Sequence, residues 1–190
     1  MRFNFSLVAL CISVLCLCAC DHHGGEPVRL NSYAHLTAQD VDVLSYEIVP
    51  LASDEEHGKS DTFFFSPDDA IERFFRHRFK AAGDRGVLRV LIQSVSVDHR
   101  VVASDHVVNK TLDIGKKDHY LIRARIRVEA DNTIRGENKQ ITFNAQRNVY
   151  VSEHSSIDEK ERLQAKAIDA LIDDLDHAVT KTLEDRFFLL

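Results

Sequence analysis

Two neighbouring segments in the second half of the chain alternate between apolar and polar residues. Over residues 119–130 every second side chain is apolar, and the polar positions between them include Arg123, Arg125 and Arg127. Residues 141–151 also alternate, with amides and hydroxyls on the polar side. The side chains of a strand point alternately to its two faces, so this pattern predicts two strands that are each buried on one face only. The polar turn residues between the two segments favour a hairpin.

Two further segments are predicted to join the same sheet. Residues 41–51 place several apolar side chains on one face, and Pro50 marks the end of this strand or an edge position. Residues 87–97 are almost continuously apolar, which predicts a central strand or one that is covered on both faces. The polar residues 98–118 form either an extended hairpin arm or a mobile loop.

Two other segments have the apolar spacing of a helix. Ser66 is predicted to cap the first helix at its N-terminus, and Gly83 is predicted to end it. The second helix spans residues 157–186, and Ser156 with Glu159 forms a capping box at its start. Each helix has one apolar face that must be buried against another element.

Together these elements predict an α+β fold with the order β-α-β-β-β-α in a single domain over residues 41–190. Two helical faces and one sheet face must be buried together. The simplest arrangement is therefore an antiparallel sheet of about four strands with both helices packed on one face. The last four residues, 187–190, are apolar and either close the core or contact a partner. The oligomeric state stays open.

The N-terminal residues have the organisation of a secretory leader. One basic residue, Arg2, precedes an apolar run over residues 7–17, which is shorter than the roughly 20 residues that a membrane-spanning helix needs. A short membrane helix that stays in the mature protein is the alternative. We predict a signal peptide over residues 1–19. Residues 20–40 are polar with little apolar periodicity, so a flexible tether is predicted between the leader and the domain.

The end of this leader resembles a bacterial lipobox. Leu17-Cys18-Ala19-Cys20 has an aliphatic residue three positions before a cysteine, with two small residues between them. The resemblance implies that Cys20 carries palmitate or a related lipid, so that the N-terminus is held in the membrane and the domain faces the periplasm. Asp21 either resembles the residue that keeps some lipoproteins in the inner membrane or is the first polar residue of the tether. The choice between inner and outer membrane stays open.

The distribution of cysteine excludes several kinds of site. All four cysteines lie within the first twenty residues. Cleavage before Cys20 leaves a single thiol at the first position of the chain. This excludes an internal disulfide framework, a cysteine-based zinc site and a buried thiol nucleophile. With 30 acidic against 24 basic residues, the chain also lacks the positive charge of a general nucleic-acid surface.

Sequence motifs of catalysis and of nucleotide binding are absent. The chain has no Gly-x-Ser-x-Gly, no His-Glu-x-x-His and no nucleotide-binding glycine pattern. Gly58-Lys59-Ser60 matches only the end of a P-loop, because a serine replaces its first glycine. The adjacent His22 and His23 belong to the tether and are a poor preformed metal site. We expect no enzyme, no cofactor and no metal site, while a Ser, His and Asp brought together by folding stay an alternative.

The order of elements over residues 41–186 resembles that of small α+β lipoproteins of envelope transport machines. Examples are the lipopolysaccharide-assembly lipoprotein and the auxiliary lipoproteins of ABC-type lipid transporters. Residues 66–83 and the final helix, with Glu-Lys-Glu-Arg at positions 159–162, are similar to uncharacterised alphaproteobacterial lipoproteins. The likeness to the transport lipoproteins rests on element order, and neither resemblance transfers a functional residue.

These observations predict a non-catalytic accessory or binding subunit of an envelope assembly or transport complex. Its expected partners are the membrane and an envelope protein of unknown identity. Arg123, Arg125 and Arg127 are the candidate contact surface, and a solvent-washed sheet face without a partner is the alternative for this row. The second predicted function is a carrier or sensor of a small anionic or lipidic ligand held between helices and sheet. The third is a hydrolase with a site assembled in space.

Overall fold

The computed structural model describes residues 28–31, 33, 36–50, 62–103, 115–132 and 137–186. The α+β class and the order of the longer elements are as predicted. The predicted leader, Cys20 and residues 187–190 lie outside the described residues. The elements are β1 (Gln39–Val41), β2 (Ser45–Val49), α2 (Pro67–Arg78), β3 (Phe79–Ala81), β4 (Val87–Val102), β5 (Lys117–Asn132), β6 (Glu137–Ser152) and α4 (Ile157–Arg186).

The main sheet has four strands in the order β2-β4-β5-β6. β4 pairs antiparallel with β5, and β5 pairs antiparallel with β6. β4 is therefore central, as its apolar sequence predicted. It continues to Val102 and β5 begins at Lys117, so the segment predicted as an arm or loop is strand at both of its ends. The middle of that segment, residues 104–114, lies outside the described residues.

The pairing of β2 differs from the prediction. β2 runs parallel to β4, with Ser45 opposite Val87 and Val49 opposite Leu91, so the sheet is mixed and not wholly antiparallel. The connection from β2 to β4 contains α2, and a crossover helix returns the chain so that the next strand runs in the same direction. The alternation of apolar residues is the same in both orientations, so the sequence pattern does not distinguish them.

The first helix begins where the sequence predicts and ends earlier. A backbone N–H in its first turn donates to Ser66 Oγ at 3.4 Å. The helix ends at Arg78 because the next three residues form β3, which pairs in parallel with β1. Gly83 is therefore not the helix cap. A Cβ atom at this position would lie 2.6 Å from the carbonyl carbon of Asp42, so the close approach of two backbone segments requires glycine here.

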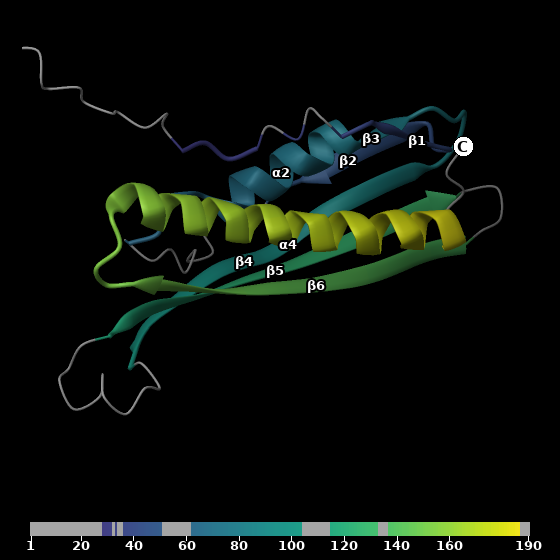
Figure 1. The fold of residues 1–190 in the computed structure, drawn as a ribbon. Coiled ribbons are helices and arrows are strands. Elements are labelled where there is room, and N and C mark those ends of the chain that lie inside the picture. The colour runs from purple at the N-terminus through teal and green to yellow at the C-terminus, as the bar shows by residue number, and fades with distance from the viewer. Residues whose placement is uncertain are drawn as a thin grey trace, which may run out of the picture.

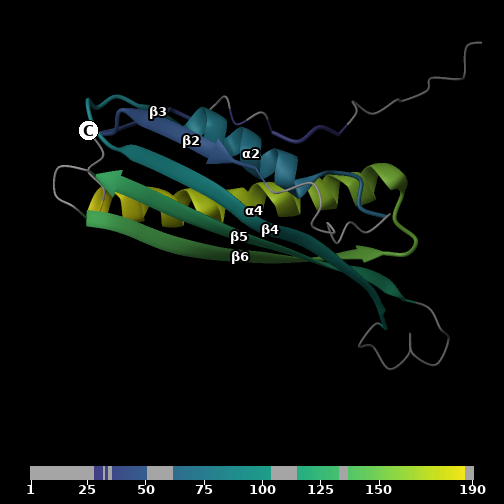
Figure 2. The same cartoon turned by 180° about the vertical axis from the view of Figure 1, so that it is seen from behind.

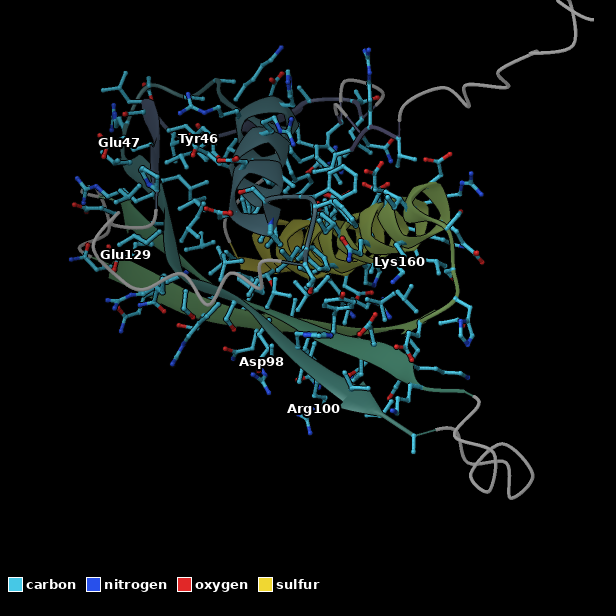
Figure 3. The ribbon with its side chains drawn as sticks, turned by 90° about the vertical axis from the view of Figure 1, so that its left-hand side faces the viewer. Tyr46, Glu47, Asp98, Arg100, Glu129 and Lys160 are labelled. Carbon is cyan, nitrogen blue, oxygen red and sulfur yellow. The ribbon has the colours of Figure 1, made fainter. Side chains whose placement is uncertain are left out.

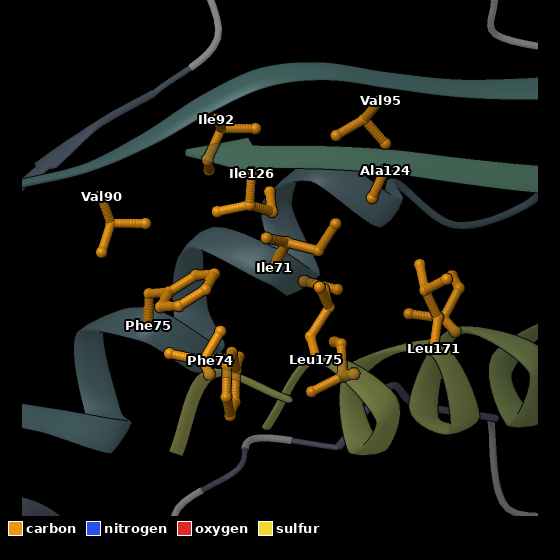
Figure 4. Close-up of a cluster of buried hydrophobic side chains, with 14 of the residues drawn as sticks. Ile71, Phe74, Phe75, Val90, Ile92, Val95, Ala124, Ile126, Leu171 and Leu175 are labelled. Carbon is orange, nitrogen blue, oxygen red and sulfur yellow. The ribbon is translucent and has the colours of Figure 1, made fainter. Parts of the chain in front are cut away.

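Both helices cover the same face of the main sheet, and no helix or strand of the described ranges covers the other face (Figures 1 and 2). Figure 4 shows how side chains of the two helices meet those of the strands in the core. Full burial of one such side chain contributes roughly 1.5–3 kcal/mol to stability. The buried side chains in this close-up include Ile71, Phe74, Phe75, Val90, Ile92, Ile126, Leu171 and Leu175.

The segment before β1 packs against both helices. Tyr33 is 3% exposed, and its ring meets that of Phe74 edge to face. The Tyr33 hydroxyl donates to Asp169 of α4 at 3.2 Å, and Asn31 donates to the same carboxylate at 2.8 Å. Burial and the nearby Asp169 raise the pKa of Tyr33, so its hydroxyl keeps its proton. The packed part of the chain therefore begins before residue 41, and residues 20–27 of the predicted tether lie outside the described residues.

Candidate interaction surface on the open sheet face

The candidate site is the face of the main sheet that points away from α2 and α4, and we call it the open face. The odd-numbered side chains of β5 and their neighbours in register on the other strands define it. In Figure 3, Asp98 and Arg100 point away from the helices. The open face includes Glu47, Arg89, Ser94, Ser96, Asp98, Arg123, Arg125, Arg127, Glu129, Gln140, Thr142, Asn144, Gln146 and Asn148.

Two of the three predicted arginines are paired within this face. Arg123 forms an ion pair with Asp98 of β4. Arg127 forms one with Glu129 of its own strand, at 2.8 Å. These side chains are about a third to a half exposed, so the pairs add little to stability and mainly hold the guanidinium groups in place. The positive charges of Arg123 and Arg127 are therefore offset by neighbouring carboxylates.

Arg125 differs from its two neighbours. Its side chain is exposed and has no hydrogen bond or ion pair with any residue in the described part of the chain. In register it lies between Ser94 of β4 and Asn144 of β6, which are both uncharged. A guanidinium offers five N–H donors in a planar fork that fits a carboxylate or a phosphate. Among the described residues, the centre of the open face thus presents one cation without an ion pair, flanked on the neighbouring strands by neutral hydrogen-bonding groups.

The side of the open face toward β2 carries a third ion pair. Arg89 Nε lies 2.9 Å from Glu47 Oε2. The hydrogen bond with Glu47 raises the pKa of Arg89, so this guanidinium stays charged. Charges of both signs therefore alternate over β2, β4 and β5, whereas β6 contributes amides and hydroxyls.

An aromatic pair forms one end of the open face. His119 of β5 stacks on Tyr150 of β6 with ring centroids 4.5 Å apart, and its Nε2 lies 2.8 Å from Asn148 Oδ1. His119 is only 8% exposed because Tyr150 covers it. Sequence reasoning missed this pair because it depends on the strand register, which places His119 directly opposite Tyr150.

A second histidine, His99 of β4, lies on the helix-facing side of the sheet, close to the first turn of α4. His99 Nε2 is 2.9 Å from Asp118 Oδ1, and Lys160 Nζ is 3.6 Å from the other oxygen of the same carboxylate. The His99 ring also stacks on Tyr120. These contacts connect the β4–β5 hairpin to α4. Within the described ranges no group of three His, Cys, Asp or Glu side chains could hold a metal ion.

Two hollows on the surface lie outside the interface between helices and sheet. One, of about 390 Å³, lies at the end of the open face and is lined by Arg89, Glu129 and Asp131 among others. The other, of about 730 Å³, lies beside α4 and is lined by Arg78 and Asp176 among others. Arg78 forms a 2.6 Å ion pair with Asp176 that joins the two helices, so this lining is part of the helix packing.

The anchor predicted at Cys20 lies outside the described residues. Among the helices of the described ranges, none is both long enough and apolar enough to cross a membrane.

No family model matches the chain, and no curated protein matches it in sequence. Among solved structures, it is similar to a minor lipoprotein from Acinetobacter baumannii (14% identity, TM-score 0.40, 77% of this chain and 95% of that one). It is also similar to a neuraminyllactose-binding hemagglutinin homolog from Helicobacter pylori (11% identity, TM-score 0.46, 82% of this chain and 92% of that one). A third similar structure is a DUF330 protein from Xanthomonas campestris (9% identity, TM-score 0.40, 82% of this chain and 91% of that one). These likenesses concern the course of the chain alone and transfer no residue of the open face.

Proposed function

We propose that this protein is a lipid-anchored, periplasm-facing envelope protein that acts as a non-catalytic accessory or binding subunit of an envelope complex. The open face is its contact surface for an envelope protein. The observation that carries this proposal is Arg125, an exposed arginine with no ion pair to any described residue, at the centre of a face whose neighbouring arginines are paired.

The shape and charge of the open face support a protein partner. An extended sheet surface suits another protein, whereas small ligands bind in concave sites. Arg123 and Arg127 already form ion pairs before any partner arrives, although Arg127 Nε has no hydrogen-bond partner in the described residues. A carboxylate of the partner placed over Arg125 gains a charge-assisted hydrogen bond, and the amides around it can bind backbone groups of the partner.

The second candidate function, a carrier of a small ligand between helices and sheet, has less support. Such a carrier needs an apolar cavity between the two layers. In the described residues that space is occupied by buried aromatic and aliphatic side chains. The accessory function is therefore the better supported of the two.

Reversing the charge of Arg125 tests the proposed contact surface. We expect Arg125→Glu to reduce recovery of the partner about tenfold or more in a crosslinking pulldown from cells, because the substitution places a carboxylate against the partner's acidic group. Thermal stability should change little, since the Arg125 side chain has no partner within the described residues.

The matched control is Arg162→Glu on α4. Arg162 is likewise exposed and has no ion pair with a described residue, but it lies on the helical layer and not on the open face. This variant should recover the partner as the wild type does. Equal recovery with Arg125→Glu and with the wild type would show that the open face is not the contact surface.

Cysteine replacement tests the anchor separately. We expect Cys20→Ser to abolish labelling by a palmitate analogue and to leave the protein unprocessed or unanchored, because lipid attachment requires the thiol of Cys20. Cys18→Ser is the control, since it keeps a small residue at the same place in the lipobox and should be labelled normally. Persistent labelling of Cys20→Ser in gel fluorescence and membrane fractionation would refute the lipobox assignment.

A further inference from the structure

β6 is an edge strand of unusual length. All sixteen of its residues pair with β5 on one side. On its other side it has no strand partner in the described part of the chain, because β6 ends the strand order of the main sheet. Figures 1 and 2 show it at the border of the sheet, beside α4. Within the described residues, the outward-facing backbone N–H and C=O groups of β6 therefore have no strand partner.

The outer edge of β6 lacks three of the features that normally prevent strand pairing, although another of them, inward-pointing charge, is present at Lys139 and Arg147. Edge strands are commonly protected by proline, by β-bulges or by being short. β6 contains no proline, and its register with β5 is unbroken from Asn132 opposite Glu137 to Lys117 opposite Ser152. By contrast, β2 at the other border has five residues, and β4 has a register shift between Ile92 and Ser94.

The side chains of β6 also permit pairing with an identical strand. When two copies of one strand pair antiparallel about a two-fold axis, charged residues near the axis meet charges of the same sign and repel each other. On the open face, β6 carries no charge between positions 138 and 150. These positions are occupied by Asn138, Gln140, Thr142, Asn144, Gln146, Asn148 and Tyr150.

The helix-facing side of β6 is compatible with a register centred on Ala145. Between positions 139 and 151 its two charged residues are Lys139 and Arg147, and Arg147 is paired with Asp174 of α4 at 2.5 Å. A two-fold axis at Ala145 keeps both cations away from their counterparts, because Arg147 then lies opposite Phe143 of the other copy. The partly exposed Phe143 is covered in this arrangement.

We propose that β6 pairs antiparallel with β6 of a second copy of this chain about a two-fold axis at Ala145, which joins the two main sheets into one sheet of eight strands. The occupant of the edge is thus a second copy, bound through backbone hydrogen bonds along β6 and through contacts of Phe143 and Ala145. The proposal does not depend on the partner at Arg125, which lies on the neighbouring strand.

Disulfide crosslinking of the full-length protein in its own membranes tests this register. Opposed residues of antiparallel strands have Cα atoms about 4.5–5.5 Å apart, which is within the range of a disulfide. Ala145→Cys should form a dimer of twice the monomer mass under mild oxidation, visible on a non-reducing gel. Wild type and Ser94→Cys, whose new thiol lies on β4 away from the edge, should stay monomeric.

A second pair of variants keeps the test independent of the partly buried Ala145. In the proposed register Asn144 of one copy lies opposite Gln146 of the other, and both side chains are exposed. Cells that produce an Asn144→Cys copy and a Gln146→Cys copy together should yield at least fivefold more dimer than cells that produce either copy alone. Monomers in all of these experiments would overturn the proposal, and so would crosslinks only to a protein of different mass, which would mean that another strand occupies the edge.

Discussion

Replacing Phe74 by alanine is expected to lower the free energy of unfolding by about 3–5 kcal/mol, the usual cost of removing a buried phenylalanine ring. Phe74 is 0% exposed and lies where α2, α4 and the segment before β1 meet. Its ring contacts Phe75 at a centroid distance of 4.9 Å and Tyr33 at 6.0 Å. The cavity left by the substitution would therefore loosen three parts of the chain together.

Phe64→Ala is the matched control for this prediction. It removes the same atoms from a side chain that is 50% exposed, so we expect a loss below about 1 kcal/mol. Urea unfolding of the purified full-length protein, followed by circular dichroism, measures both values. Similar losses for the two variants would contradict the assignment of Phe74 to the centre of the core.

The second large effect is expected at a buried polar residue. Gln164 of α4 is 0% exposed, and its amide makes two hydrogen bonds to the backbone before α2. Its Oε1 accepts from the Phe64 N–H at 2.9 Å, and its Nε2 donates to the Thr62 carbonyl at 3.1 Å. Gln164→Leu keeps most of the side-chain volume but leaves both backbone groups without this hydrogen-bond partner. We expect it to lower the free energy of unfolding by about 2–4 kcal/mol.

Gln146→Leu provides the comparison for this effect. Gln146 is exposed on the open face, so the same exchange should change the free energy of unfolding by less than about 0.5 kcal/mol. Hydrogen exchange supplies a local measurement, because the Phe64 amide should lose protection in Gln164→Leu. If that amide stays protected and the stability is unchanged, the buried amide does not hold this segment in place.

These effects separate stability from binding. Phe74 and Gln164 lie between the sheet and the helices, whereas Arg125 lies on the side of the sheet that the helices leave open. Substitutions between the layers should lower stability. Substitution of Arg125 should leave stability nearly unchanged, so a loss of partner recovery with Arg125→Glu is attributable to the surface itself.

Much of the fold was predictable because it depends on local patterns. Alternation over residues 119–130 and 141–151 is produced by burial on one side, and the structure confirms it in β5 and β6. The caps at Ser66 and Ser156 were predictable because a serine hydroxyl accepts from a backbone N–H three residues later, at 3.4 Å and 3.2 Å. The one-sided arrangement of the helices followed from the need to bury three apolar faces together.

The parts that sequence reasoning missed depend on residues that are distant in the chain. The orientation of β2 is set by its pairing with β4, and β3 replaces the last turn of the predicted helix because β1 is available to pair with it. Packing of Tyr33 depends on Phe74 and Asp169, which lie far along the chain. Short-range periodicity contains no information on such contacts.

For the candidate site, the sequence by itself determined that three arginines share one solvent-facing side of a strand, because a period of two places them there. It also determined that the chain beyond residue 20 has no cysteine with which to form a disulfide. Only the tertiary structure decided which of the three has no ion pair to a described residue. Asp98 on β4 comes to Arg123 through the strand register, and Glu129 turns toward Arg127, while uncharged side chains flank Arg125 on the neighbouring strands. Ion pairing depends on distances between strands, and these exist only in the folded sheet.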